Sequence, residues 1–78
     1  MDDNRLIFMA NQIGDFFKSY PEDEAIEGIA THIQKFWDPR MRRGVFTHLA
    51  QGGAGLNPLT RKALQQLAAK QPHLAKSA

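Results

Sequence analysis

Three arginines in one short stretch are the residues of this chain best suited to bind a ligand: Arg40, Arg42 and Arg43. A guanidinium group offers a planar set of donors that fits a carboxylate or a phosphate. The arginines follow Asp38 and Pro39, which predict a helix start, and in a first helical turn the dipole disfavours each cation by about 0.3 to 1 kcal/mol. Two explanations are open: the arginines pair with Asp38 and the acids of the preceding helix, or they contact an external anionic surface.

Two aromatic residues favour a protein as the external partner: Trp37, next to these arginines, and Phe8, on the first predicted helix. Trp37 directly precedes the arginine stretch, and Trp and Arg are over-represented among residues that dominate interface energy. The alternative position for Trp37 is the core, because it closes the apolar stripe of its own helix. Phe8 points about 160° away from the centre of the apolar stripe of its helix. We therefore expect Phe8 to be exposed and to form, with Ile7, a second apolar face for another chain.

The three histidines do not indicate a catalytic or metal site. His32 borders the apolar stripe of one predicted helix and His48 lies within that of the next, so we expect satisfied core or boundary side chains. His73 lies after Pro72, and no neighbour has metal-ligand spacing. The sequence has no cysteine, which excludes disulfides, thiolate zinc sites and iron–sulfur ligation. We therefore expect no catalytic residue, no cofactor-binding residue and no metal ligand in this chain.

A glycine-rich segment, Gly52-Gly53-Ala54-Gly55, precedes a predicted helix start and superficially resembles a phosphate-binding loop. It lacks the lysine and the preceding strand of a Walker loop, and no βαβ unit surrounds it. Glycines adopt positive φ angles at low cost, which suits the end of one helix and a turn into the next. We interpret the segment as a helix-ending loop.

Length and composition predict one small helical domain over residues 1–78. The chain is 42% hydrophobic and 23% charged, which is typical of a globular protein. A chain of 78 residues buries only about 60% of its unfolded surface, so a protein partner is the expected source of further stability. No apolar run reaches the ~20 residues of a membrane span, and we find no secretory signal. We expect a cytoplasmic protein.

The charges divide the chain into two halves. Residues 1–37 carry seven acids and three bases, a net charge of about −4, whereas residues 38–78 carry one acid and seven bases, about +6. The net charge of the whole chain is +2. Such asymmetry indicates either an anionic partner surface or a solvated basic face.

Apolar spacing and helix-end signals predict four helices and no strand. The helices are expected over residues 4–19, 21–37, 39–50 and 58–70, with a C-terminal tail over 71–78. Asp38-Pro39 and Asn57-Pro58 are the start signals of the last two. The predicted inner faces consist of Leu6, Met9, Ala10, Ile13, Phe16, Phe17 and Tyr20; Ala25, Ile26, Ile29, Ala30, Ile33, Phe36 and Trp37; Met41, Val45, His48 and Leu49; and Leu59, Ala63, Leu64 and Leu67. The fold class is all-α, a small single-domain bundle of four helices with short loops.

Three ordered segments carry a resemblance to a known family. They are MANQIG over 9–14, FWDPRMR over 36–42, and GGAGLNPL over 52–59 followed by Ala63-Leu64. Together they resemble the delta subunit of soluble NAD-dependent formate dehydrogenase, and FWDPRMR is the most specific of them. The likeness covers about residues 5–68, and neither residues 21–24 nor the tail after Lys70 contributes to it.

The resemblance implies a non-catalytic small subunit of a cytoplasmic oxidoreductase complex. The other subunits of that complex carry a molybdenum or tungsten pterin, iron–sulfur clusters and FMN, and transfer electrons from formate to NAD. By the same resemblance, this subunit docks on the large formate-oxidising alpha subunit and supports its assembly or its cofactor-loaded state. We expect neither nucleic acid nor a membrane as partner, and self-association of the isolated chain is open.

The residues expected at the partner contact come from the matched motifs, except Phe8, which comes from the exposure argument. They are Phe8, Asn11, Gln12, Trp37, Arg40 and Arg42, with Gly53 and Gly55 shaping the loop. The alternative function is a small basic-faced helical module that binds nucleic acid. Two observations count against it: the basic residues are few, and no helix-turn-helix pattern is recognisable. A small enzyme is the weakest reading, since no convergent polar set is present.

Overall fold

A computed structural model describes residues 2–75 of the chain, which form four main helices and a short fifth. The helices are α1 (Asp3–Phe17), α2 (Glu22–Phe36), α3 (Pro39–Ala50), α4 (Pro58–Lys70) and α5 (Pro72–Ala75). Within these described residues there is no strand, so the predicted all-α class is confirmed. The predicted bounds of α3 and α4 are those observed, whereas α1 ends at Phe17, two residues before the predicted end.

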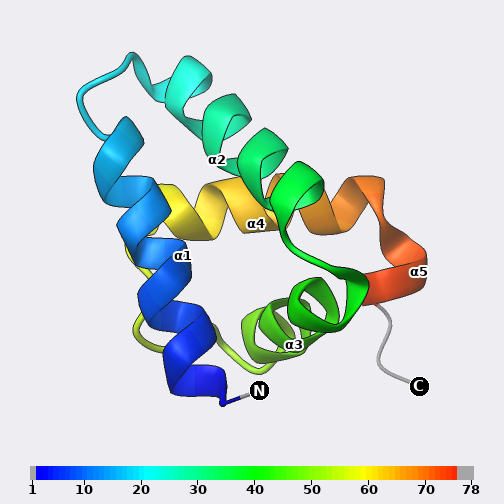
Figure 1. The fold of residues 1–78 in the computed structure, drawn as a ribbon. Helices are drawn as coiled ribbons and strands as arrows, with labels where there is room; N and C mark the ends of the chain where they lie inside the picture. Colours follow the sequence, from blue (N-terminus) through cyan, green and yellow to red (C-terminus); the bar gives the residue numbers. More distant parts are fainter. Residues whose placement is uncertain (1, 76–78) are drawn as a thin grey trace.

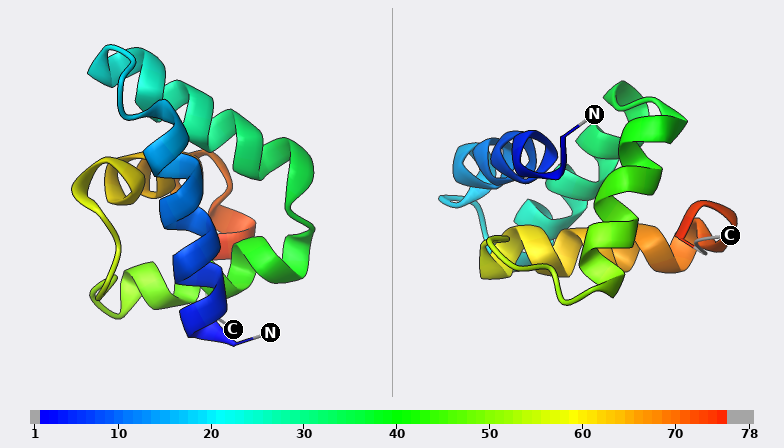
Figure 2. Two further views of the ribbon diagram at one scale, coloured as in Figure 1. Left: turned by 60° about the vertical axis from the view of Figure 1, so that its left-hand side comes forward. Right: turned by 90° about the horizontal axis from the view of Figure 1, so that it is seen from below.

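The helices are arranged around a V formed by α1 and α2. These two helices diverge from the loop that joins them, and α4 crosses behind both (Figure 1). The most extensive packing is between α2 and α4, and α4 also packs against α1 and α3. The first turns of α1 lie beside α3, as two further views show (Figure 2). The core therefore lies between α4 and the other three main helices, and one side of the V faces away from it.

Helix starts follow the predicted capping chemistry in one case and depart from it in another. The Asp38 carboxylate accepts a hydrogen bond of 2.9 Å from the Met41 amide, which confirms the predicted cap of α3. Asn57 makes no such side-chain cap on α4. Its backbone amide instead donates to Oδ1 of Asn11 on α1, at 2.9 Å. The start of α4 is thus held by a tertiary contact rather than by a local one.

The core confirms most of the predicted inner faces, with named exceptions. Phe16, Tyr20 and Phe36, all predicted to face inward, are 69%, 47% and 70% exposed. Tyr20 lies beyond the end of α1, so the helical angle does not apply to it. The buried residues of α1 are Leu6, Ala10 and Gly14, spaced by four, and Phe16 lies about 200° around the helix from Gly14. The inner face of α1 is therefore narrower than the apolar arc of its sequence.

Two fully buried residues were not predicted. Phe46 on α3 is 2% exposed, and Thr60 on α4 is completely buried. Thr60 lies where α1 crosses α4, because a Cβ atom at Gly14 would overlap the Thr60 hydroxyl. Gly14 therefore permits the close approach of these two helices. The packing requires a residue without a side chain at this position, and Gly14 does not mark a turn.

The segment after Lys70 differs from the predicted tail. Residues Pro72–Ala75 form α5, which packs on α3 and α4, and Leu74 is only 6% exposed. A single apolar residue after a proline gives no periodicity, so sequence reasoning had no signal for this helix. The remainder of the predicted tail, residues 76–78, lies outside the described residues.

Candidate partner-binding surface

The open side of the V contains an apolar groove between α1 and α2. Near the loop that joins the two helices, the ring of Phe17 occupies the space that a side chain at Gly28 would need. From that point they diverge, which leaves a hollow of about 480 Å³. Its walls and floor are formed by Met9, Gln12, Ile13, Phe16, Phe17, His32 and Trp37.

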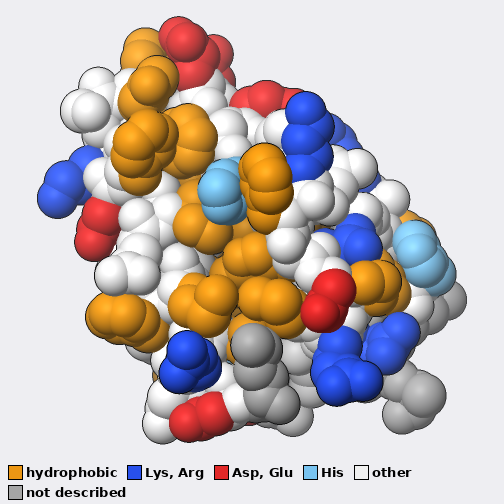
Figure 3. All heavy atoms as spheres, viewed as in Figure 1, with side chains coloured by type: hydrophobic (Ala, Val, Ile, Leu, Met, Phe, Trp, Pro, Cys, Tyr) orange, Lys and Arg blue, Asp and Glu red, His pale blue; other side chains and the backbone are white. Residues whose placement is uncertain are grey.

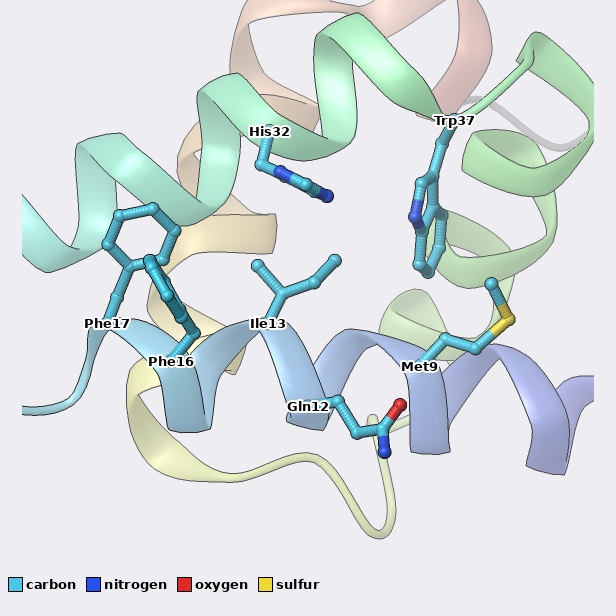
Figure 4. A pocket seen from close by; sticks show the side chains of 7 residues that line it. All are labelled: Met9, Gln12, Ile13, Phe16, Phe17, His32 and Trp37. Atoms are coloured by element: carbon cyan, nitrogen blue, oxygen red, sulfur yellow. The ribbon is translucent and has the colours of Figure 1, made fainter.

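Figure 4 shows how these side chains face one another across the groove. His32 on α2 and Trp37 just after it point toward α1, while Met9 and Ile13 point back toward them, and Gln12 lies at the outer edge. Only two of the seven lining side chains are polar, Gln12 and His32, and none is a carboxylate, lysine or arginine. The groove is suited to apolar groups, since an unpaired charge placed there would be partly desolvated.

A second hollow of about 560 Å³ continues from the first along α2, and Phe17 and His32 line both. Its other lining residues are Glu24, Glu27, Gly28, Thr31, Lys35 and Phe36. The His32 ring packs against the Phe36 ring with centroids 4.8 Å apart. The uncharged first hollow thus adjoins a second one that carries two carboxylates near the start of α2 and the ammonium group of Lys35 near its end.

Exposed aromatic rings lie on the two helices that form this surface, and two of them, Phe16 and Phe36, line it. Phe8 is 62% exposed, as predicted, and Phe16 and Phe36 are exposed to a greater extent. Hydrophobic side chains gather over α1, over the facing side of α2 and in the space between them (Figure 3). Sequence reasoning assigned Phe16 and Phe36 to the core and so missed them as surface residues. Contiguous apolar patches on a small protein mark interaction sites more often than isolated apolar residues do.

The arginines of α3 have no internal carboxylate partner within residues 2–75. The one ion pair found there joins Lys62 to Glu22, at 3.3 Å. Arg42 is half-buried and donates from Nη1 to the Gln71 side-chain oxygen at 2.9 Å, while its Nε is buried without a hydrogen-bond partner. The explanation by internal pairing with acids is therefore wrong for the described part of the chain.

Arg40 and Arg43 differ from Arg42 because both are exposed. They line a small hollow of about 300 Å³ together with Asp3, Leu6, Gly44 and Thr47. This hollow lies between the N-terminal turns of α1 and α3 and shares no lining residue with the apolar groove. Of the three arginines, Arg40 and Arg43 are thus positioned to meet an external anion, whereas Arg42 links α3 to the segment before α5.

Asn11 and the glycine loop, predicted at the contact, are engaged in internal hydrogen bonds. The Asn11 amide donates to the Gly55 carbonyl at 2.8 Å and accepts from the Asn57 amide. The Arg61 guanidinium donates to the carbonyls of Gly52 and Gly53, at 2.8 and 2.9 Å. These contacts pin the loop between α3 and α4 against α1 and α4.

The loop conformation itself agrees with the predicted helix-ending turn. Gly52, Gly53 and Gly55 have φ angles of 114°, 64° and 89°, which favour glycine. His48 Nε2 lies 2.7 Å from the Ala54 carbonyl, so this histidine is satisfied, as expected. The loop is a structural connection between two helices that is held by several hydrogen bonds.

The expected contact residues therefore do not lie together. Gln12 and Trp37 line the groove, where Trp37 is only 5% exposed and forms part of its floor. Phe8 is exposed on α1, and Arg40 is exposed in the first turn of α3, where it lines a separate hollow. Asn11, Arg42, Gly53 and Gly55 make internal contacts; a role for any of these eight residues in partner binding stays a prediction.

Two further properties concern the whole described chain. Residues 2–75 contain no cluster of three or more His, Cys, Asp or Glu side chains that could hold a metal ion. None of the helices in that range has the length and continuous apolar character needed to cross a bilayer.

Comparison with known proteins identifies one family. The sequence profile described as NADH-dependent formate dehydrogenase delta subunit FdsD matches residues 5–64, which is most of the 78-residue chain. The matched range contains all three motifs on which the resemblance was based. No curated protein and no solved structure matches the chain. The chain therefore belongs to the FdsD family, the delta subunits of NADH-dependent formate dehydrogenase.

Proposed function

We propose that this chain is a non-catalytic, cytoplasmic subunit that docks on the large formate-oxidising alpha subunit of the formate dehydrogenase complex. The observation that carries the proposal is the exposed aromatic set on α1 and α2: Phe8, Phe16 and Phe36. Three large rings exposed to this extent on a 78-residue protein are costly to leave in water, and aromatic residues are enriched at protein interfaces. Membership of the delta-subunit family supports a formate dehydrogenase subunit as the partner.

The electron-transfer cofactors belong, in this proposal, to the other subunits. The chain has no cysteine with which to ligate an iron–sulfur cluster. We therefore assign the molybdenum or tungsten pterin, the iron–sulfur clusters and the FMN to the larger subunits. The delta subunit contributes binding energy rather than chemistry.

Binding energy can support assembly or cofactor retention in a defined way. A subunit that binds the folded, cofactor-loaded conformation more tightly than the empty one shifts the population toward the loaded form, by an amount set by its differential affinity. The small chain is stabilised in return by mass action, since the partner binds only its folded state. Both effects follow from one interface.

The test is to purify the tagged chain from its own cells at moderate salt and to identify the bound proteins by mass spectrometry. We expect the large alpha subunit in stoichiometric amount, with formate-dependent NAD reduction in the eluate. Deleting the chain is expected to lower the pterin and metal content of the alpha subunit, and restoring it in trans is the control. Recovery of nucleic acid, or of the chain alone, would contradict the proposal, and the first result would favour the nucleic-acid-binding alternative.

A further inference from the structure

We propose that the groove between α1 and α2 binds an amphipathic helix of the large formate dehydrogenase subunit, with a basic residue of that helix over Glu24 and Glu27. This inference rests on the proposed function and specifies its contact. The bound segment is expected to be a helix of about two turns with an apolar face, a basic residue toward one end and an acidic residue toward the other.

The length of the groove favours a helix of about two turns. Met9 and Phe17 lie at its two ends on α1, and eight residues of helix rise about 12 Å. Apolar residues at positions i, i+3 or i+4, and i+7 of a partner helix span about 10 Å, which matches this length. A third helix laid on two diverging helices can also pack its ridges into the groove between them.

The lining of the groove favours the apolar face of that helix. Met9, Ile13 and Trp37 supply an apolar floor without any charged group. Phe16 stands at the rim, 69% exposed, and its ring is in edge contact with Phe17, with centroids 5.0 Å apart. Such a ring can close over an inserted apolar side chain and exclude water from it, as residues around an interface hot spot do.

The charges at the two ends fix the direction of the bound helix. The second hollow contains Glu24 and Glu27, both exposed, and neither forms an ion pair with another residue in the described range 2–75. Lys35 lines the same hollow about two turns further along α2, away from the two carboxylates. One oxygen of Glu27 accepts from the Gln66 amide at 2.8 Å. Toward the N-terminal turns of α1, the exposed Arg40 and Arg43 line a separate hollow together with Asp3. A helix with a basic residue at one end and an acidic residue at the other meets complementary charge in only one orientation.

Site-specific photocrosslinking within the assembled complex tests the proposal. Phe16 is replaced by the photoreactive analogue benzoylphenylalanine, and Gln65, exposed on α4, is replaced in the same way as the matched control. The complex is irradiated and the crosslinked peptides are sequenced. We expect crosslinks from position 16 to one alpha-subunit peptide with apolar residues at helical spacing and a basic residue at one end, and none to that peptide from position 65.

A charge exchange provides the second measurement. Glu24→Lys combined with Glu27→Lys is expected to weaken retention of the chain in the complex by roughly tenfold. Reversing the basic residue of the crosslinked peptide to Glu is expected to restore it, which a merely destabilised variant would not do. Failure of this rescue would overturn the assigned orientation of the charges.

The outcomes separate this inference from the proposed function. If the complex contains the chain but position 16 is not crosslinked, or is crosslinked to a second copy of the chain, the groove assignment is wrong and docking on the large subunit stands. If the chain does not assemble with any formate dehydrogenase subunit, both proposals are wrong.

Discussion

The loop between α3 and α4 and the groove between α1 and α2 use neighbouring residues of the same helix in opposite ways. Toward the loop, α1 presents Asn11, whose side chain bonds to both Gly55 and Asn57. Toward the groove it presents Gln12, which is exposed and whose side chain makes no hydrogen bond with another residue in the described range. One residue is committed to the fold, and the next is available to a partner.

This contrast separates two kinds of motif residue. Asn11, Gly53 and Gly55 belong to the recognisable segments of the family, and their contacts are internal. Phe16 lies outside those segments and is among the most exposed aromatic residues of the described chain. The family segments therefore contain both kinds of residue: Asn11 holds the domain together, whereas Gln12 and Trp37 line the groove.

The largest expected effect is on the loop side. Asn11→Ala removes two hydrogen bonds of 2.8 and 2.9 Å between distant segments, and we expect the free energy of unfolding to fall by about 2 kcal/mol. Chemical denaturation of the isolated domain measures this directly. Gln12→Ala is the matched control, for which we expect a change below about 0.5 kcal/mol. Equal losses in the two variants would remove the contrast between loop and groove.

The next largest effect is on the groove side and concerns affinity instead of stability. Phe16→Ala removes a ring that packs on few residues of its own chain, so the unfolding transition is expected to change little. We expect binding to the large subunit to weaken by more than tenfold, about 1.4 kcal/mol, as for an interface anchor. Titration of the purified subunits provides the affinity. Phe16→Leu, which keeps an apolar side chain, should recover part of it, whereas unchanged affinity in Phe16→Ala would place the interface elsewhere.

Local sequence patterns predicted the parts of the fold that local physics determines. Asp38 and Pro39 specify the start of α3, and the glycines after Ala50 specify its end, so the bounds of α3 were exact. The end of α1 was placed two residues too late, because Ser19 and Tyr20 continue the apolar and polar pattern although the chain turns after Phe17. Helix α5 depends on a tertiary contact of Leu74 and has no local signal.

The candidate surface was only partly predictable, for a geometric reason. The exposure of Phe8 follows from its angle on one helix. The buried side of α1 is centred on Leu6, Ala10 and Gly14, so Phe16, at the edge of the apolar arc of the sequence, lies outside it, and Phe36 is exposed in the same way at the end of α2. Helical spacing alone does not show which part of an apolar arc faces the core. Pattern reasoning therefore assigned to the core two rings that line an open groove.

A smaller effect is expected where a helix start is held by local chemistry alone. Asp38→Ala removes the carboxylate that accepts from the Met41 amide, and we expect a loss of ~1 kcal/mol and a lower melting temperature. Asp38→Asn, which keeps an accepting oxygen, should retain most of the stability. Asn57→Ala is expected to lower the free energy of unfolding by less than Asp38→Ala, because the Asn57 side chain makes no cap on α4. A larger loss in Asn57→Ala would contradict the assignment of these two helix starts.

The smallest effect should come from the exposed arginines, and salt distinguishes it from the others. Arg40→Glu combined with Arg43→Glu is expected to weaken binding to the large subunit at low salt by about 0.5 to 1 kcal/mol, because exposed charge pairs are screened. The difference from the wild type should shrink as the ionic strength rises, whereas the loss caused by Phe16→Ala should persist. Arg42→Ala is the internal control: because its guanidinium bonds to Gln71, its loss should lower stability without changing the salt dependence of binding. A salt dependence carried by Arg42 and not by Arg40 and Arg43 would mean that the anionic partner approaches α5 instead of the hollow between α1 and α3.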